Sequence, residues 1–225
     1  MTVLLLLATF AIFLLIDYFR TRHAMVNPAL HVSEAKYDSA VPRLRPALVS
    51  GFEVPENLRY HPGHTWALSE SPNLVRVGMD DFASKLTGKL ESITLPQRGQ
   101  WIRQGQKMCT IQRDGCVVDM VSPIEGTVSN VNESVARDPK LALSDPYGEG
   151  WLLTVQAPDA KTGFRNLLGG ALARWWTEES AIRLQRRMSA FAGALAQDGG
   201  VAVNDLTNHI PDQEWLTLAK EFFLS

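Results

Sequence analysis

The side chains with the clearest chemical potential lie in a short stretch around residues 109–116. Cys109 and Cys116 are the only two cysteines of the chain, and Arg113 and Asp114 lie between them. A thiolate is a nucleophile, and a nearby guanidinium favours the thiolate over the thiol. A redox-active or group-carrying thiol at Cys116 is therefore one hypothesis, and an ordinary cysteine is the simpler interpretation that we favour.

Asp114 and Gly115 predict a tight turn in this stretch. A type I′ turn requires φ > 0 at both central residues, and Asp-Gly is one of the pairs that favour it. The flanking runs at 109–112 and 117–120 suit two antiparallel strands. The predicted hairpin tip, which is also the candidate contact surface, consists of Arg113, Asp114, Gly115 and Cys116.

The turn also fixes the predicted register of the two strands. Arg113 should face Cys116, and Cys109 should face Met120. The two cysteines are therefore not cross-strand partners, and we expect no disulfide between them.

Histidines and carboxylates elsewhere form no second reactive group. His61 and His64 flank a Pro-Gly turn without a third ligand nearby in the sequence, so a metal site is weakly supported. Asp80 and Asp81 suit the first turn of a short helix, where acids complement the helix dipole. We predict no catalytic residues and no metal site.

Composition excludes several function classes. The chain has 225 residues, of which 45% are hydrophobic and 20% charged, which is ordinary globular usage. Its formal net charge is -2, from 22 basic and 24 acidic residues, so no basic excess suggests a nucleic-acid partner.

Residues 57–158 predict a compact β-domain that positions the hairpin. Short runs rich in Val, Ile, Leu and Thr alternate with Gly, Pro and Asn, which is typical of a barrel or sandwich. Short helices are expected at 80–86 and 133–139. The predicted strand runs are 74–77, 90–95, 108–111, 117–121, 127–131 and 151–155.

The first nineteen residues predict a transmembrane anchor. No charge occurs from Val3 to Ile16, and arginines follow the run rather than precede it. That order disfavours a cleaved signal peptide and places the following domain in the cytoplasm. We expect a single-pass protein of the cell membrane; the alternative is a helix buried in a soluble core.

The remaining segments are a linker at 20–56 and a helical extension at 159–225. Four prolines in the linker predict an extended tether. In the extension, Thr177 is expected to cap one helix that ends at the glycines 199–200, and another begins near Pro211. Their apolar stripes should pack on the domain or on each other: Leu184, Met188, Phe191 and Leu195 in one, Trp215, Leu218 and Phe222 in the other.

The middle of the chain resembles the H protein of the glycine cleavage system. The resemblance runs from about Tyr60 to Asp159 and rests on YHPGHTWA at its start, SPIEGTV after the hairpin, and DPYGEGW near its end. It implies a lipoyl/biotinyl-like barrel-sandwich hybrid, so the predicted fold is mainly β with helical ends. In that family a hairpin lysine carries lipoate, which shuttles an aminomethyl group between the decarboxylase, the aminomethyltransferase and the dihydrolipoyl dehydrogenase.

The lysine of that resemblance is missing. The family's lipoyl lysine lies eight residues before the Ser-Pro proline, here Pro123, which places Gly115 at its position. No lysine occurs between Lys107 and Lys140. A guanidinium stays protonated and is not acylated, so Arg113 does not substitute. We predict that lipoate is absent and that the chain has no other cofactor.

These observations predict a membrane-anchored, non-lipoylated adaptor that binds a partner enzyme through the hairpin tip, and not an enzyme. One alternative is a carrier-type component of the glycine cleavage system or a related pathway, with the group held elsewhere, such as on Cys116. A second is a membrane-fusion-type adaptor of a transporter. The contiguous barrel motifs, with helices after them, count against the second.

Overall fold

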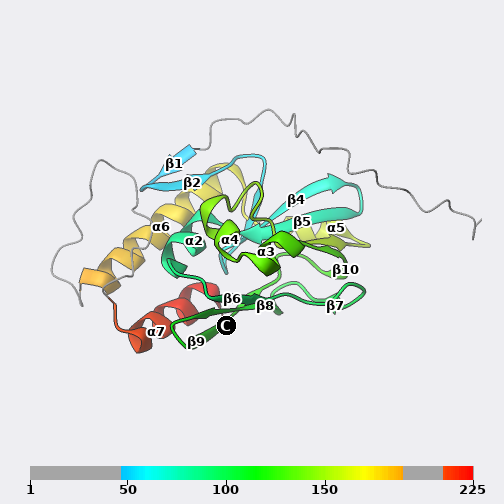
Figure 1. The fold of residues 1–225 in the computed structure, drawn as a ribbon. Helices are drawn as coiled ribbons and strands as arrows, with labels where there is room; N and C mark the ends of the chain where they lie inside the picture. Colours follow the sequence, from blue (N-terminus) through cyan, green and yellow to red (C-terminus); the bar gives the residue numbers. More distant parts are fainter. Residues whose placement is uncertain (1–46, 190–209, 225) are drawn as a thin grey trace, which may run out of the picture. The chain divides into compact units, whose positions relative to one another are not determined.

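The computed structural model describes residues 47–189 and 210–224 (Figure 1). The predicted anchor at 1–19 and the linker up to residue 46 lie outside these residues, as does the predicted helix end at 199–200. Within the described part of the chain, none of the helices combines the length and apolarity needed to cross a bilayer.

Three antiparallel sheets form the framework of the described chain. The largest has the order β3-β4-β5-β11-β10-β7, a second has the order β6-β8-β9, and β1 pairs with β2. The strands are β1 (Ala47–Val49), β2 (Phe52–Val54), β3 (Arg59–His61), β4 (Thr65–Ser71), β5 (Leu74–Met79), β6 (Ser92–Thr94), β7 (Trp101–Ile102), β8 (Lys107–Arg113), β9 (Cys116–Val121), β10 (Gly126–Val131) and β11 (Leu153–Gln156).

Helices lie in the connections and at the C-terminal end. They are α2 (Asp81–Thr87), α3 (Glu133–Arg137), α4 (Lys140–Ser144), α5 (Ala160–Arg165), α6 (Gly170–Ser189) and α7 (Asp212–Phe223). The predicted mainly β class is confirmed: each of the six predicted runs overlaps a strand, and the short helices expected at 80–86 and 133–139 are α2 and α3.

The two larger sheets share one apolar core, as in a sandwich. Val75 and Val155 come from the larger sheet, and Ile111 and Met120 from the smaller one, and all four are fully buried. Side chains alternate between the two faces of a strand, so each sheet sends every second residue into this core. Helix α7 adds Trp215, Leu218, Phe222 and Phe223 to the same cluster.

The predicted linker at 20–56 is wrong at its C-terminal end. Residues 47–54 form the β1–β2 hairpin, in which Phe52 and Val54 are buried. These two residues are separated by one exposed residue, so both side chains lie on the same face of β2, toward α2 and α6. This burial is the reason why the segment forms a strand. A two-residue Ser-Gly turn with positive φ at both positions closes the hairpin.

The predicted start of the first C-terminal helix is also wrong. Thr177 is not a cap: α6 begins at Gly170, and the Thr177 hydroxyl donates to the Ala173 carbonyl one turn back. Ala173 and Trp176 are buried against the sheet, so tertiary packing extends the helix toward its N-terminus. The predicted start near Pro211 is confirmed for α7, as is the burial of its apolar stripe.

We predict that Gly78→Ala destabilises the domain by about 2 kcal/mol, because it overpacks the core. Gly78 lies opposite Trp66, and an added Cβ would come 2.5 Å from the indole ring. That ring is held in place, since its Nε1 donates to the Pro146 carbonyl at 3.0 Å. Urea unfolding gives the change in free energy.

The matched control is Ser71→Ala on the same strand pair, where the side chain is exposed. It should change the free energy of unfolding by less than about 0.5 kcal/mol. Equal stability of Gly78→Ala and the unsubstituted chain would show that the Trp66 ring is free to move aside.

Candidate functional site

The β8–β9 hairpin has the turn that the sequence predicts. Asp114 has φ 47° and Gly115 has φ 77°, so both central residues are left-handed, as a type I′ turn requires. Arg113 pairs with Cys116 and Cys109 with Met120, which confirms the predicted register. Both cysteines are free thiols.

Alternation along the hairpin gives it two different faces. The inner face carries Cys109, Ile111 and Arg113 from β8, with Val118 and Met120 from β9, and all five are buried. The outer face is polar and is more exposed to solvent than the inner face. There the Thr110 hydroxyl donates to Asp119 at 2.8 Å, and Val117 is 52% exposed.

Arg113 is not the exposed contact residue that we predicted. Its side chain is only 3% exposed, and its Nη1 donates to the Thr87 carbonyl at 3.0 Å. The guanidinium also lies over the indole of Trp215, 5.0 Å from the ring centroid. Helix α7 packs along β9 and covers this side of the tip, which is why the arginine is buried.

The two thiols lie in different environments. Cys109 is fully buried, and this burial raises the pKa of its thiol to about 12, which keeps it protonated and unreactive. Cys116 is half-buried, and its thiol points to the Asp212 carbonyl at the start of α7, 3.6 Å away. Cys116 is therefore the thiol with access to solvent.

The turn itself presents no amine. Gly115 stands where we predict the lipoyl lysine of the resembling family to fall, and an added Cβ there would meet nothing within 4 Å. Lys107 lies at the other end of β8, where its Nζ pairs with Asp119 at 2.8 Å. The open space at Gly115 would admit a lysine side chain, although the left-handed backbone disfavours one.

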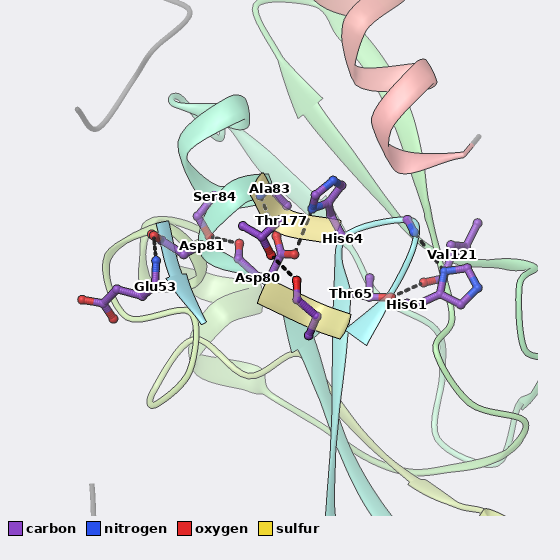
Figure 2. A network of polar contacts seen from close by, with 12 residues as sticks. Glu53, His61, His64, Thr65, Asp80, Asp81, Ala83, Ser84, Val121 and Thr177 are labelled. Atoms are coloured by element: carbon purple, nitrogen blue, oxygen red, sulfur yellow. Dashed lines mark hydrogen bonds and ion pairs between the residues drawn. The ribbon is translucent and has the colours of Figure 1, made fainter. Parts of the chain in front are cut away.

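His64 and Asp80 form a buried pair at the start of α2 (Figure 2). His64 Nδ1 is 2.9 Å from Asp80 Oδ2, and both residues are inaccessible to solvent or nearly so. Since a carboxylate only accepts, the imidazole donates from Nδ1. The other carboxylate oxygen caps α2 by accepting from the Ala83 amide at 2.8 Å, which confirms the predicted place of Asp80 at the start of a helix.

Aromatic rings from three helices enclose His64. Phe82 of α2 stacks on the imidazole with 4.0 Å between centroids, Trp176 of α6 lies at 4.4 Å, and Phe222 of α7 at 6.0 Å. Within the described residues, no hydrogen-bond partner reaches Nε2. Among the residues that the structure describes, no hydroxyl or thiol bonds this nitrogen, and the ring contacts join α2, α6 and α7 around the pair.

A second polar network beside this pair ties β2 to α2. Asp81 accepts from the Glu53 amide at 2.8 Å and from Lys85 Nζ at 2.7 Å (Figure 2 shows the first contact). Burial raises the pKa of Asp81, opposed by these two hydrogen bonds. Tyr147 bridges the same elements, because its hydroxyl accepts from the Asp81 amide and donates to the Glu53 carbonyl.

His61 and His64 do not form a common site. His61 Nδ1 accepts from the Gly63 amide at 3.0 Å, inside the turn, whereas His64 points to Asp80. Burial, and to a lesser extent the charge of His64, lowers the pKa of His61. In the part of the chain that the structure describes, no group of three or more potential metal ligands occurs.

Two features were not predicted from the sequence: the His64–Asp80 pair and the covering of the hairpin by α7. The β4–β5 register pairs Thr65 with Met79, so the next positions outward are His64 and Asp80. Assigning this register from the sequence would have found the pair. The covering of the hairpin by α7 has no such local signal, since the two segments are about a hundred residues apart.

Fold and site together define a two-sheet β-domain in which one hairpin ends in a two-residue turn. Residues 58–174 match the family model described as Glycine cleavage H-protein, which is about half of the chain. The chain therefore belongs to the glycine cleavage H-protein family, whose members are lipoyl carriers and not catalytic enzymes. The match extends beyond the predicted domain end at residue 158, into α6.

Individual relatives each cover about half of the chain. The glycine cleavage system H protein of Mycobacterium avium is 37% identical over 108 residues, which is 48% of this chain and 82% of the relative. That of an Anaeromyxobacter species is 32% identical over 127 residues, or 56% and 98%. A crystal structure of the Mycobacterium marinum H protein aligns with a TM-score of 0.47 and 26% identity, covering 56% of this chain and 98% of that one.

The burial of Arg113 predicts a structural effect of its removal. Arg113→Ala should lower the free energy of unfolding by about 3 kcal/mol, because a charged hydrogen bond and a cation–π contact are lost inside the core. Urea unfolding is the measurement.

Arg137→Ala is the control, since this arginine is 78% exposed and pairs with Glu133 on the surface. It should change stability by less than about 0.5 kcal/mol. If Arg113→Ala were as mild as Arg137→Ala, the guanidinium would not be the interior contact described above.

Proposed function

We propose that this chain is an H-protein-like adaptor that carries no lipoyl group and binds a partner protein. The observation that carries the proposal is Gly115 at the centre of the hairpin turn. A lipoyl amide needs a primary amine at this tip, and the guanidinium of the neighbouring Arg113 is neither an acylable amine nor exposed. The retained turn supports a hairpin kept as a scaffold.

The exposed part of the tip is the contact surface of this proposal. Asp114 and Gly115 project at the turn, and Val117 is 52% exposed on the outer face of β9. Arg113 is not part of this contact surface because its side chain is buried. An exposed valine beside a charged turn is an ordinary feature of a protein-binding surface, with an apolar centre and a polar rim.

A membrane location completes the proposal. The uncharged run from Val3 to Ile16 would anchor the chain, and the arginines after it would keep the H-protein-like domain in the cytoplasm. The adaptor would then hold its partner near the membrane.

A carrier role is the second candidate, favoured by membership of a family of lipoyl carriers. In this chain the carried group would need another attachment atom, and the half-buried thiol of Cys116 is the one nearest the turn. The two candidates differ in whether the native protein bears a covalent group.

Intact mass spectrometry of the protein from its native source decides between them. We expect the mass of the unmodified sequence, because no acylable amine lies at the tip. Gly115→Lys, expressed with a lipoate ligase, is the matched variant and should gain a lipoyl group, since the space around position 115 is open. A lipoyl group on the unsubstituted chain would overturn the adaptor proposal.

Partner binding is tested on the full chain purified from native membranes in mild detergent. Val117→Asp should reduce co-purification of a specific partner at least tenfold, because it charges the apolar centre of the surface. Leu172→Asp on α6 is the control, since Leu172 is equally exposed at 53% but belongs to a different element. Equal loss in both variants would contradict the hairpin surface, and recovery of the chain only in the soluble fraction would contradict the anchor.

A further inference from the structure

Strand β9 forms one edge of the smaller sheet. The order of this sheet is β6-β8-β9, so within the described residues β9 pairs with β8 alone and has no strand on its other side (Figure 1). Helix α7 contacts β9 from the inner face, where the Cys116 thiol lies 3.6 Å from the Asp212 carbonyl. The edge itself lies next to the contact surface of the proposed function, which includes Val117.

The register of the hairpin determines which main-chain groups of β9 point away from β8. In a two-residue turn the carbonyl of Arg113 accepts from the amide of Cys116, so these residues form a hydrogen-bonded pair. Hydrogen-bonded and non-hydrogen-bonded pairs alternate along an antiparallel ladder, and the next pair, Gln112 with Val117, is therefore non-hydrogen-bonded. The Gln112 carbonyl fits this assignment, since it accepts at 2.9 Å from the amide of Glu91, immediately before β6. The N–H and C=O of Val117 thus point to the open side of β9.

Asp119 has the same main-chain orientation as Val117. Val118 and Ile111 form the next hydrogen-bonded pair, and Asp119 and Thr110 form the next non-hydrogen-bonded one. Two donors and two acceptors of β9 are therefore directed outward. In the part of the chain that the structure describes, no main-chain hydrogen bond outside the helices and strands involves Val117 or Asp119. A strand edge with such groups is a template for pairing with another extended chain.

The β9 edge (Cys116–Asp119) is the part of this strand that can accept a neighbour. Natural edge strands are protected against pairing by prolines, lysines and bulges. The irregularity of the β8–β9 ladder lies between Lys107 and Cys109, opposite the last two residues of β9. From Cys116 to Asp119 the ladder is regular, and the sequence has neither proline nor lysine. These four residues next to the turn therefore lack the usual protection.

The outer face of the β9 edge offers one apolar and one acidic position. The side chain of Val117 is 52% exposed. Two residues further on, the Asp119 side chain is 35% exposed and pairs with Lys107 Nζ at 2.8 Å. Directly opposite residues of paired strands lie about 5 Å apart and favour apolar or opposite-charge pairs. A strand with an apolar residue opposite Val117 and a lysine or arginine opposite Asp119 complements this edge.

We propose that the partner binds by β-augmentation: an extended segment of the partner adds a fourth strand to the β6-β8-β9 sheet along the β9 edge. The segment carries an apolar residue opposite Val117 and a basic residue two positions away, opposite Asp119. Main-chain hydrogen bonds supply the affinity, and the two side chains supply the specificity. This inference rests on the proposed adaptor function and gives its contact surface a defined mode of binding.

Two substitutions at one position separate main-chain from side-chain recognition in the full chain. Val117→Pro removes the outward amide, which takes no part in the ladder to β8, and proline is tolerated at such edge positions. Val117→Ala is the matched control, since it removes more of the apolar side chain than proline does but keeps the amide.

The probe is a fluorophore-labelled, end-blocked peptide in which valine and threonine alternate and a lysine lies two positions from a central valine. Fluorescence anisotropy with the full chain in mild detergent should show binding that Val117→Pro weakens by about tenfold, because a main-chain hydrogen bond is lost and the ring blocks the strand. Val117→Ala should weaken binding by less than about threefold, because only part of one apolar contact is lost.

Hydrogen exchange of the unsubstituted full chain tests the same edge without a substitution. In the free chain the Val117 and Asp119 amides should exchange about a hundredfold faster than the Val118 amide, which is bonded to β8. The peptide should slow exchange at Val117 and Asp119. Unchanged exchange at both amides in the presence of the peptide would overturn the proposal.

Three further results would overturn β-augmentation by a partner. The first is equal binding of the peptide to Val117→Pro and Val117→Ala, and the second is no binding to the unsubstituted chain at millimolar peptide. The third is a dimer that Val117→Pro dissociates in light scattering, since a second copy would then occupy the edge. The adaptor function fails separately, if Val117→Asp retains the co-purified partner while the peptide still binds the unsubstituted chain.

Discussion

The two-residue turn at Asp114-Gly115 is the constraint on which the site depends. It fixes the register of β8 and β9, and the register places Arg113 on the inner face in line with Ile111. A guanidinium on that face needs both a hydrogen-bond acceptor and a cover. The Thr87 carbonyl supplies the first and Trp215 the second, so the turn and α7 are joined through this one side chain.

His64 connects the same helix to the rest of the domain. The residue has φ 58°, in the left-handed region, and ends the turn between β3 and β4. Its backbone carbonyl accepts from the Asp80 amide, and its ring meets the Asp80 carboxylate. Side chain and main chain of one residue thus fix the start of α2, while Trp176 and Phe222 bring α6 and α7 onto the same ring.

The strands, the hairpin register and the start of α2 depend on neighbouring residues, so local patterns in the sequence predicted them. Short runs of Val, Ile, Leu and Thr between turn residues predicted the strands, the Asp114-Gly115 pair predicted the hairpin register, and Asp80 and Asp81 predicted the start of α2. The burial of Arg113 and the early start of α6 depend on contacts between segments far apart in the chain. No periodicity around Arg113 carries information about Trp215, so an arginine beside a turn was assigned to the surface.

The backbone of the same turn favours glycine over lysine at its centre. Gly115 has φ 77°, and a side chain in this conformation costs roughly 1–2 kcal/mol, so glycine satisfies the turn better than lysine would. The residue that best closes the hairpin is the one that offers no amine. A hairpin with a favourable turn, a buried inner face and its own covering helix has the properties of a fixed surface, which is what the adaptor proposal requires and a swinging arm does not.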